Sequence, residues 1–147
     1  MATGTFDILH PGHVLYLKKA KQLGGRDSKL IVVVARDSTV HVKKRIPIVN
    51  ENQRLEMVKL LKPVDEAYLG HKTDMFKIVA EIKPDIIAIG PDQKFDLEYI
   101  KNQLKLRNLN PKVLRVENYY KSHLDSTCKI IKKIKNTPLK KSTFKDC

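Results

Sequence analysis

Hydrophobic and polar positions follow two alternating patterns along this chain of 147 residues. Short, continuously apolar runs rich in β-branched side chains, such as 30–35 and 86–89, are typical of strands that are buried on both faces. Between these runs, apolar residues recur every three or four positions, the spacing of an amphipathic helix. Together the patterns predict strands at 1–3, 30–35, 67–69, 86–89 and 113–116, and helices at 14–23, 50–63, 75–82, 97–104 and 126–135.

This alternation of strand and helix predicts an α/β fold in which right-handed crossovers build a parallel sheet. We expect a Rossmann-like, doubly wound sheet of five strands in the order 3-2-1-4-5, with helices on both faces. No repeat or linker divides the chain. We therefore expect one domain over 1–136, followed by a basic, flexible tail over 137–147.

The predicted first strand is unusually short. Three residues precede Gly4, whereas a strand typically has about five or six residues. Either the start of the chain is misplaced or the strand is truncated. In both cases we expect the strand at the centre of the sheet to be less well anchored than its neighbours.

Polar residues gather directly after this first strand. The segment 4–7 leads into His10 and His13, which precede a predicted helix. The first N–H groups of a helix lack partners and the helix dipole is positive there, so a helix start attracts anions. Doubly wound sheets bind ligands where the strand order reverses, which here brings the loop 90–93 to the same place. The pattern predicts a site for a polyphosphate.

Composition narrows the class of protein. The net charge is +13, and 121–147 carries eight lysines against two aspartates, which fits a nucleic-acid binder or an enzyme with phosphorylated ligands. Aromatic residues are only 6% of the chain, so stacking platforms for bases are scarce. No apolar run approaches the roughly 20 residues that span a bilayer, and no secretory leader is visible. We expect a soluble, cytoplasmic protein with no membrane and no nucleic-acid partner, in which Cys128 and Cys147 are free thiols.

Several motifs resemble those of the nucleotidyltransferase superfamily, which contains cytidylyl- and adenylyltransferases. Its first signature, Gly-Thr-Phe-Asp followed by His-x-Gly-His, is similar to 4–7 and 10–13. Its second signature resembles 126–130, at the start of the last helix. Within the superfamily, Gly-Pro-Asp-Gln at 90–93 and Tyr-Tyr-Lys at 119–121 look most like the archaeal FAD synthases. The resemblance covers about residues 2–135 and implies transfer of AMP from ATP to FMN.

Nucleotidyl transfer asks a protein mainly to position phosphates and to stabilise developing negative charge. We expect His10 and His13 to donate hydrogen bonds to the α- and β-phosphates, with Pro11 and Gly12 shaping the turn. The other expected site residues are Thr5 and Phe6 through the loop backbone, Asp92 at the ribose or base, Tyr119 at a ring or the nucleotide, Ser126 and Thr127 at the β- and γ-phosphates, and Lys129 at the leaving pyrophosphate.

Two expectations rest on relatives or on general phosphate chemistry. The resemblance implies that Lys43, Lys44 and Arg45 form a loop that closes over the triphosphate. A divalent cation such as Mg²⁺ would be held mainly through the ATP phosphates, with Asp7 as a candidate protein ligand. Simpler interpretations stay open for some of these residues: a helix cap for Ser126 and Thr127, a turn for Asp92, packing for Tyr119 and a solvated surface for the basic run.

The leading hypothesis is an FMN adenylyltransferase, with ATP and FMN as its small-molecule substrates and FAD and pyrophosphate as its products. A CTP-dependent cytidylyltransferase that acts on glycerol 3-phosphate or a related alcohol phosphate is the first alternative. A non-catalytic module that binds nucleic acid is a more distant one. A homodimer is expected by analogy with cytidylyltransferases.

Overall fold

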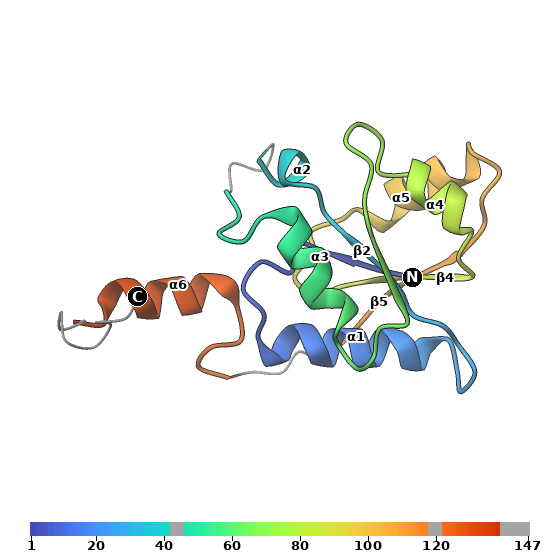
Figure 1. Ribbon diagram of the computed structural model, residues 1–147. Helices are drawn as coiled ribbons and strands as arrows, with labels where there is room; N and C mark the ends of the chain where they lie inside the picture. The colour runs from blue at the N-terminus through green and yellow to red at the C-terminus, as the bar shows by residue number, and fades with distance from the viewer. Residues whose placement is uncertain (42–45, 118–121, 139–147) are drawn as a thin grey trace.

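The computed structural model describes residues 1–41, 46–117 and 122–138 (Figure 1). Strands and helices alternate along these residues. In chain order they are β1 (Ala2–Gly4), α1 (Pro11–Leu23), β2 (Ile31–Val34), α2 (Asp37–His41), α3 (Glu51–Lys59), β3 (Glu66–Leu69), α4 (Lys77–Ile82), β4 (Ile86–Ile89), α5 (Leu97–Lys105), β5 (Lys112–Arg115) and α6 (Thr127–Asn136).

The sheet has the predicted topology. Its five strands lie in the order β3-β2-β1-β4-β5, and each neighbouring pair is parallel. β2 aligns with β3 over four register positions, and β4 aligns with β5 over four. The prediction of a doubly wound, five-stranded parallel sheet is therefore confirmed, and the carboxyl ends of β1 and β4 meet where the strand order reverses.

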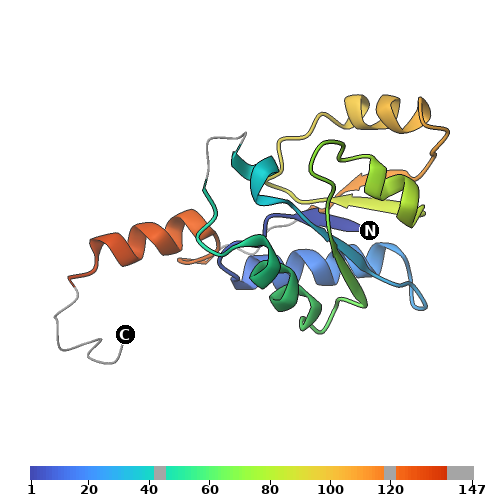
Figure 2. The ribbon, with the colours of Figure 1, turned by 45° about the horizontal axis from the view of Figure 1, so that its top comes forward.

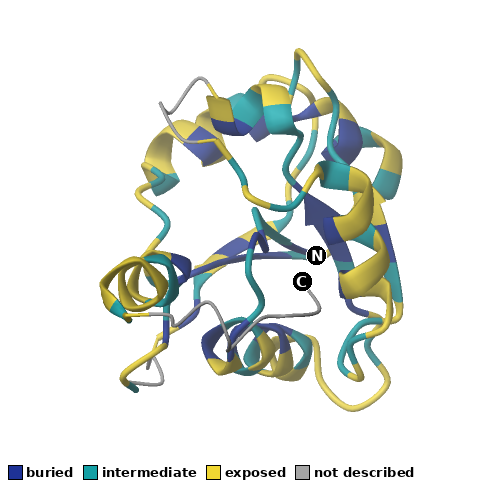
Figure 3. Ribbon diagram, turned by 60° about the vertical axis from the view of Figure 1, so that its left-hand side comes forward, coloured by how far each residue is buried: buried dark blue, intermediate teal, exposed yellow. Residues whose placement is uncertain are grey.

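Helices pack on both faces of this sheet, so the molecule has two cores (Figure 1). On one face, Leu17 of α1 and Val58 of α3 pack with Val32 and Val34. On the other face, α4 and α5 cover a second cluster that includes Ile87 and Ile89 of β4. Figure 3 shows the central strands buried and the outer sides of the helices exposed. The β-branched runs are thus strands buried from both sides, as their composition predicts.

β1 is held unequally by its two neighbours. It pairs with β2 at three register positions, Ala2 to Val32, Thr3 to Val33 and Gly4 to Val34. It pairs with β4 at one, Ala2 to Ala88. The weak anchoring expected of this short strand therefore lies on its β4 side.

Helix ends largely follow the sequence signals. Asn50, where the predicted helix begins, caps α3 by accepting from the backbone amides of Asn52 and Gln53. α2 is a difference from the prediction: it has five residues, too few for periodicity to reveal. Its first residue, Asp37, forms an ion pair with the fully buried Arg54 of α3, with 2.6 Å between Oδ1 and Nη2.

The last helix, α6, projects from the body of the molecule (Figures 1 and 2). Its first turn touches the body, where Thr127 is buried and its hydroxyl donates to the carbonyl of Ile8. Further along, Ile134 is 54% exposed. Of the expected tail, only Thr137 and Pro138 belong to the described residues. Within the part of the chain that the structure describes, no helix has the length and hydropathy needed to cross a bilayer.

Candidate active site

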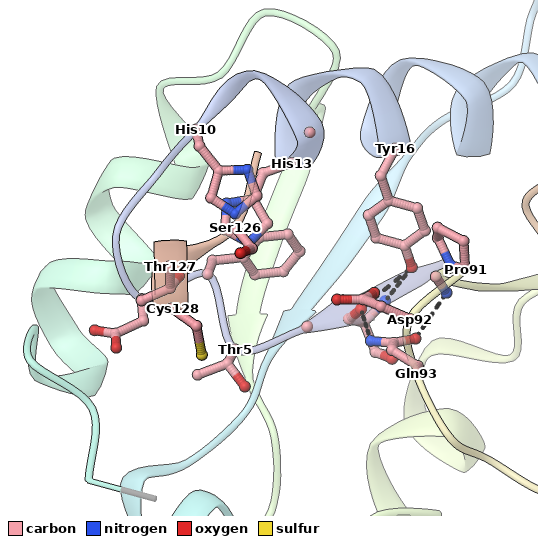
Figure 4. Close-up of a pocket in the computed structure, with 16 residues that line it drawn as sticks. Thr5, His10, His13, Tyr16, Pro91, Asp92, Gln93, Ser126, Thr127 and Cys128 are labelled. Atoms are coloured by element: carbon pink, nitrogen blue, oxygen red, sulfur yellow. Dashed lines mark hydrogen bonds between the residues drawn. The ribbon is translucent and has the colours of Figure 1, made fainter. Parts of the chain in front are cut away.

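A pocket of about 190 Å³ opens at the carboxyl edge of the sheet, between β1 and β4 (Figure 4). Three segments line it: the stretch from Thr3 through Tyr16, the loop 90–93 after β4, and the first residues of α6. These segments are far apart in sequence, and the fold places them together as predicted. The pocket is where a doubly wound sheet holds its ligand.

Two helices begin at this pocket, α1 and α6. His10 is the residue before α1, and its side chain caps no backbone amide of that helix. Ser126 is the residue before α6, and its hydroxyl accepts from the amide of Lys129. Figure 4 shows Ser126 and Thr127 beside His10 and His13. Because both helix dipoles are positive at this end, the two starts together favour an anion in the pocket.

The two histidines form a compact stack. Their ring centroids are 3.8 Å apart with an interplanar angle of 25°. His10 is buried, and its Nδ1 has no hydrogen-bond partner within the described residues. Burial lowers the pKa of His10, although Asp125 and then Asp92 act in the opposite direction. His10 is therefore neutral at pH 7, and its Nδ1 is available to form a hydrogen bond with a ligand.

Phe6 contacts the stack through the ring of His13. Its ring lies 5.3 Å from that of His13, and its backbone has a φ of +53°, in the left-handed region that non-glycine residues rarely adopt. Gly4 makes this arrangement possible, because a Cβ at Gly4 would lie 2.7 Å from the Phe6 ring. Strained residues of this kind are concentrated at functional sites.

Gly12 lets the two helix starts approach each other. A Cβ at this position would lie 3.0 Å from His10 Nδ1 and 3.1 Å from the carbonyl oxygen of Asp125. Both contacts are tighter than ordinary packing, so a side chain here would push the segment before α6 away from His10. Pro11, at the first position of α1, is exposed and does not belong to the residues that line the pocket.

Lys129 lies one turn into α6, at the margin of the pocket. Its ammonium pairs with Asp125 at 2.7 Å, and its side chain is 54% exposed. The same nitrogen donates to the carbonyl of Ser122 at 3.4 Å. The hydrogen bond from Lys129 holds the pKa of Asp125 below its usual value. Lys129 is thus beside the phosphate end of the pocket without lining it, and its expected role stays a prediction.

The carboxylate of Asp7 accepts hydrogen bonds from backbone amides. It is buried, and its Oδ1 accepts from the amides of Ile48 and Val49, each at 2.9 Å. The described residues contain no group of three or more His, Cys, Asp or Glu side chains that could hold a metal ion. Asp7 therefore has a structural role through Oδ1, and because it also lines the pocket, its candidate role as a metal ligand stays a prediction.

The buried side chain of Arg54 also holds the loop that follows β1. Its guanidinium donates to the carbonyls of Thr5, Val49 and Ala35 and to Asp37. It thereby joins the ends of β1 and β2 to the start of α3. A charged residue on a short helix is usually exposed, so no pattern in the sequence indicates this position.

The loop after β4 closes the opposite side of the pocket. Figure 4 shows Asp92 and Gln93 on this side, facing Tyr16 of α1. Gln93 and Tyr16 both bridge β1 and the end of β4 through hydrogen bonds. Arg115 of β5 donates to the carbonyls of Gly90, Gln93 and Phe95. No motif included Tyr16 or Arg115, and Gln93 belongs to the motif 90–93 but had no predicted role.

The structure therefore gathers most of the predicted site. Thr5, Phe6, Gly12, Asp92 and Thr127 line the pocket together with His10, His13 and Ser126. Cys128, which had no predicted role, lines it as well. Tyr119 and the basic run 43–45 lie outside the described residues.

Comparisons with known proteins agree with this geometry. The family model described as cytidylyltransferase-like matches residues 1–133. A protein named FAD synthase from Methanothermus fervidus is 68% identical over 135 residues, which are 92% of this chain and 93% of the relative. A protein of the same name from Methanothermobacter thermautotrophicus is 60% identical over 147 residues, which are 100% of this chain and 97% of the relative.

A solved structure shows the same likeness in three dimensions. It is described as the lipopolysaccharide core biosynthesis protein from Thermoplasma volcanium, and it superposes with a TM-score of 0.77 at 50% sequence identity. The match covers 82% of this chain and 96% of that one. With the family model spanning nearly all of the described residues, the chain belongs to the cytidylyltransferase-like family.

Proposed function

We propose that this protein is an FMN adenylyltransferase, which transfers AMP from ATP to FMN to give FAD and pyrophosphate. The observation that carries the proposal is the stacked pair His10 and His13, which lies between two helix starts at the switch point of the sheet. The name FAD synthase, shared by relatives that are 60% and 68% identical over nearly the full chain, supports the choice of nucleotide and acceptor.

The reaction is an in-line displacement. A phosphate oxygen of FMN attacks the α-phosphorus of ATP, a new P–O bond forms, and the bond from the α-phosphorus to the bridging oxygen breaks. The electron pair of that bond leaves with pyrophosphate. Protein groups accelerate such a reaction chiefly by holding the reactants in line and by stabilising the charge on the phosphoryl oxygens.

His10 and His13 are the donors to the α- and β-phosphates in this scheme. His10 is neutral before the substrate binds, because burial lowers its pKa. A polyphosphate beside the ring favours its protonated form, so His10 becomes positively charged next to the phosphates. Ser126 and Thr127, with the positive end of α6, receive the β- and γ-phosphates.

Lys129 is placed to act on the leaving pyrophosphate. Its ammonium is within one turn of Ser126 and is half-exposed. The pair with Asp125 holds it near the start of α6 without removing it from solvent. We assign the divalent cation to the substrate, bound as Mg²⁺–ATP, since the described residues do not form a cluster of metal ligands.

The nucleoside end of ATP belongs on the β4 side of the pocket. Asp92 is exposed at the mouth of the pocket and lies on a loop that Arg115 fixes. Its carboxylate suits the ribose hydroxyls or an amino group of the base. We place the reaction in the cytoplasm and expect two copies of the chain to associate, by analogy with cytidylyltransferases.

The direct test is a substrate-pair screen with the purified protein. ATP with FMN and Mg²⁺ is expected to give FAD, seen by chromatography, and an equal amount of pyrophosphate. Parallel reactions replace ATP by CTP, FMN by glycerol 3-phosphate, and Mg²⁺ by other divalent ions. Pyrophosphate from CTP and glycerol 3-phosphate, with no FAD from ATP and FMN under any metal, would replace this proposal by the cytidylyltransferase.

A further inference from the structure

The hydrogen-bond ladder between β1 and β4 is regular only at Met1. The terminal ammonium of Met1 donates to the carbonyl of Ile86 at 2.7 Å, and the amide of Ala88 donates to the carbonyl of Met1 at 2.8 Å, as in any parallel pair. The next two bonds of that ladder would run from the amide of Thr3 to the carbonyl of Ala88, and from the amide of Gly90 to the carbonyl of Thr3. In each case a side chain is inserted between the donor and the acceptor.

The hydroxyl of Tyr16 occupies the first of these two places. It accepts from the amide of Thr3 at 3.3 Å and donates to the carbonyl of Ala88 at 2.9 Å. Burial raises the pKa of this hydroxyl, so it keeps its proton and remains a donor. One oxygen thus relays the bond that the two strands would otherwise form directly.

The amide of Gln93 occupies the second place. Its Oε1 accepts from the amide of Gly90 at 2.8 Å, and its Nε2 donates to the carbonyl of Thr3 at 2.7 Å. A side-chain amide carries the same acceptor and donor as a peptide group, so it satisfies both strand ends. Arg115 fixes this turn from β5 by donating to the carbonyls of Gly90 and Gln93.

We propose that Tyr16 and Gln93 are positioning residues that hold β1 and β4 apart, so that the pocket between them stays open for the nucleoside part of the nucleotide. The inference rests on the proposed function, because it concerns the same site. It gives a role to Tyr16, which lies in no motif, and to Gln93, which closes the motif 90–93 without an assigned role.

A purely structural role does not explain this arrangement. The groups that the two side chains separate match each other, and a direct ladder would satisfy them without any side chain. Tyr16 and Gln93 both line the pocket, and their relays lie at its floor. Their removal should let the strands join, which closes the pocket while the backbone groups remain paired. The expected defect is therefore in nucleotide binding rather than in folding.

Two single variants and a matched control test the proposal. Gln93→Ala and Tyr16→Phe each remove one relay, while Gln22→Ala truncates the same type of residue at an exposed position of α1. Calorimetry with a non-hydrolysable ATP analogue should show about tenfold weaker binding for Gln93→Ala, a smaller loss for Tyr16→Phe and none for the control. The KM for FMN should stay within about twofold and Tm within about 3 °C.

The double variant sharpens the test. If both relays keep one cleft open, their effects on nucleotide affinity should be less than additive, because the first closure already removes most of the binding space. A crystal structure of the double variant should place the amide of Gly90 within about 3 Å of the carbonyl of Thr3.

The results separate this inference from the proposed function. Unchanged analogue affinity in both single variants, or equal losses in Tm and in the affinities for both substrates, would overturn the positioning role. Failure of the wild-type protein to make FAD would instead remove the proposed acceptor. The ratio of analogue affinities between variant and wild type would still decide whether the two side chains keep the cleft open.

Discussion

The phosphate side and the β4 side of the pocket are built in different ways. On the side where we propose that the phosphates bind, His10 and His13 stack on each other at the start of α1, and Ser126 caps α6 through the amide of Lys129. On the β4 side, Gln93 and Arg115 act through backbone groups that lie up to 90 residues away. Short-range contacts thus set the side chains at each helix start, whereas long-range hydrogen bonds shape the side of the pocket where we propose that the nucleoside binds.

The largest expected effect is on the phosphate side. His10→Ala and His13→Ala should each lower kcat by about 10² to 10³, since each removes a donor to the transition state. The double variant should lose little more than the worse single one, because the stacked rings act as a unit. FAD formation under saturating ATP and FMN measures this. His71→Ala, which loses a pair with Glu81, serves as the control.

Both histidine variants retaining activity near that of His71→Ala would contradict the assignment. The phosphates would then be bound by the helix starts alone, without the two histidine side chains.

The next effect is on the β4 side. Arg115→Met removes the guanidinium that donates to the carbonyls of Gly90, Gln93 and Phe95. We expect nucleotide affinity to fall about tenfold and the free energy of unfolding to fall by about 1–3 kcal/mol. Calorimetry and urea unfolding measure the two quantities. Arg26→Met, at an exposed arginine, should change neither. A loss of stability with full nucleotide affinity would mean that Arg115 supports the fold and not the site.

Lys129 should give a smaller effect. Its ammonium is half-exposed, so its charge is worth about 1 kcal/mol at the pyrophosphate, and Lys129→Met should lower kcat about fivefold. Steady-state kinetics measures this, with Lys132→Met on the same helix as the control. Equal rates for the two variants would show that Lys129 only pairs with Asp125.

The smallest expected effect is proton uptake by His10 when the nucleotide binds. In the free protein burial holds the pKa of His10 below 6.5, so the ring is neutral at pH 7. A bound polyphosphate raises that pKa, and binding near pH 6.5 should take up a fraction of one proton. Calorimetry of the ATP analogue in two buffers with different ionisation enthalpies measures the uptake. His10→Ala should abolish it, and an equal uptake in that variant would assign the proton to another group.

The same pKa fixes the sign of the effect on folding. The unfolded chain protonates His10 at a higher pH than the folded one, so His10 lowers stability as the pH falls below about 6.5. The loss stops below the folded-state pKa, where both states are protonated.

The fold could be predicted from the sequence because the signals for strands are local. The run 30–35 has no polar side chain, and such a run is stable only between two layers of helix. In the structure this strand spans Ile31–Val34, and its register with β1 ends at the pair of Gly4 and Val34. Asp37–His41 could not be predicted, because five residues are too few to show helical periodicity.

The site could be predicted only where its residues form a motif. His10, His13, Ser126 and Thr127 are marked by spacing and by the helix that follows. Tyr16 gives no such signal, since an aromatic residue on the apolar face of a helix predicts packing. Its role depends on contacts with Thr3 and Ala88, which only the folded sheet brings together.

The projecting helix α6 has a consequence for the energetics of binding. A helix of ten residues is marginal by itself in water, because nucleation costs more than so few hydrogen bonds return. Its first turn carries Ser126 and Thr127, where we propose that the triphosphate binds, and binding there would stabilise the end of the helix that joins the body. Substrate binding and helix formation are then one linked equilibrium, and the amides of α6 should exchange with solvent more slowly when nucleotide is present.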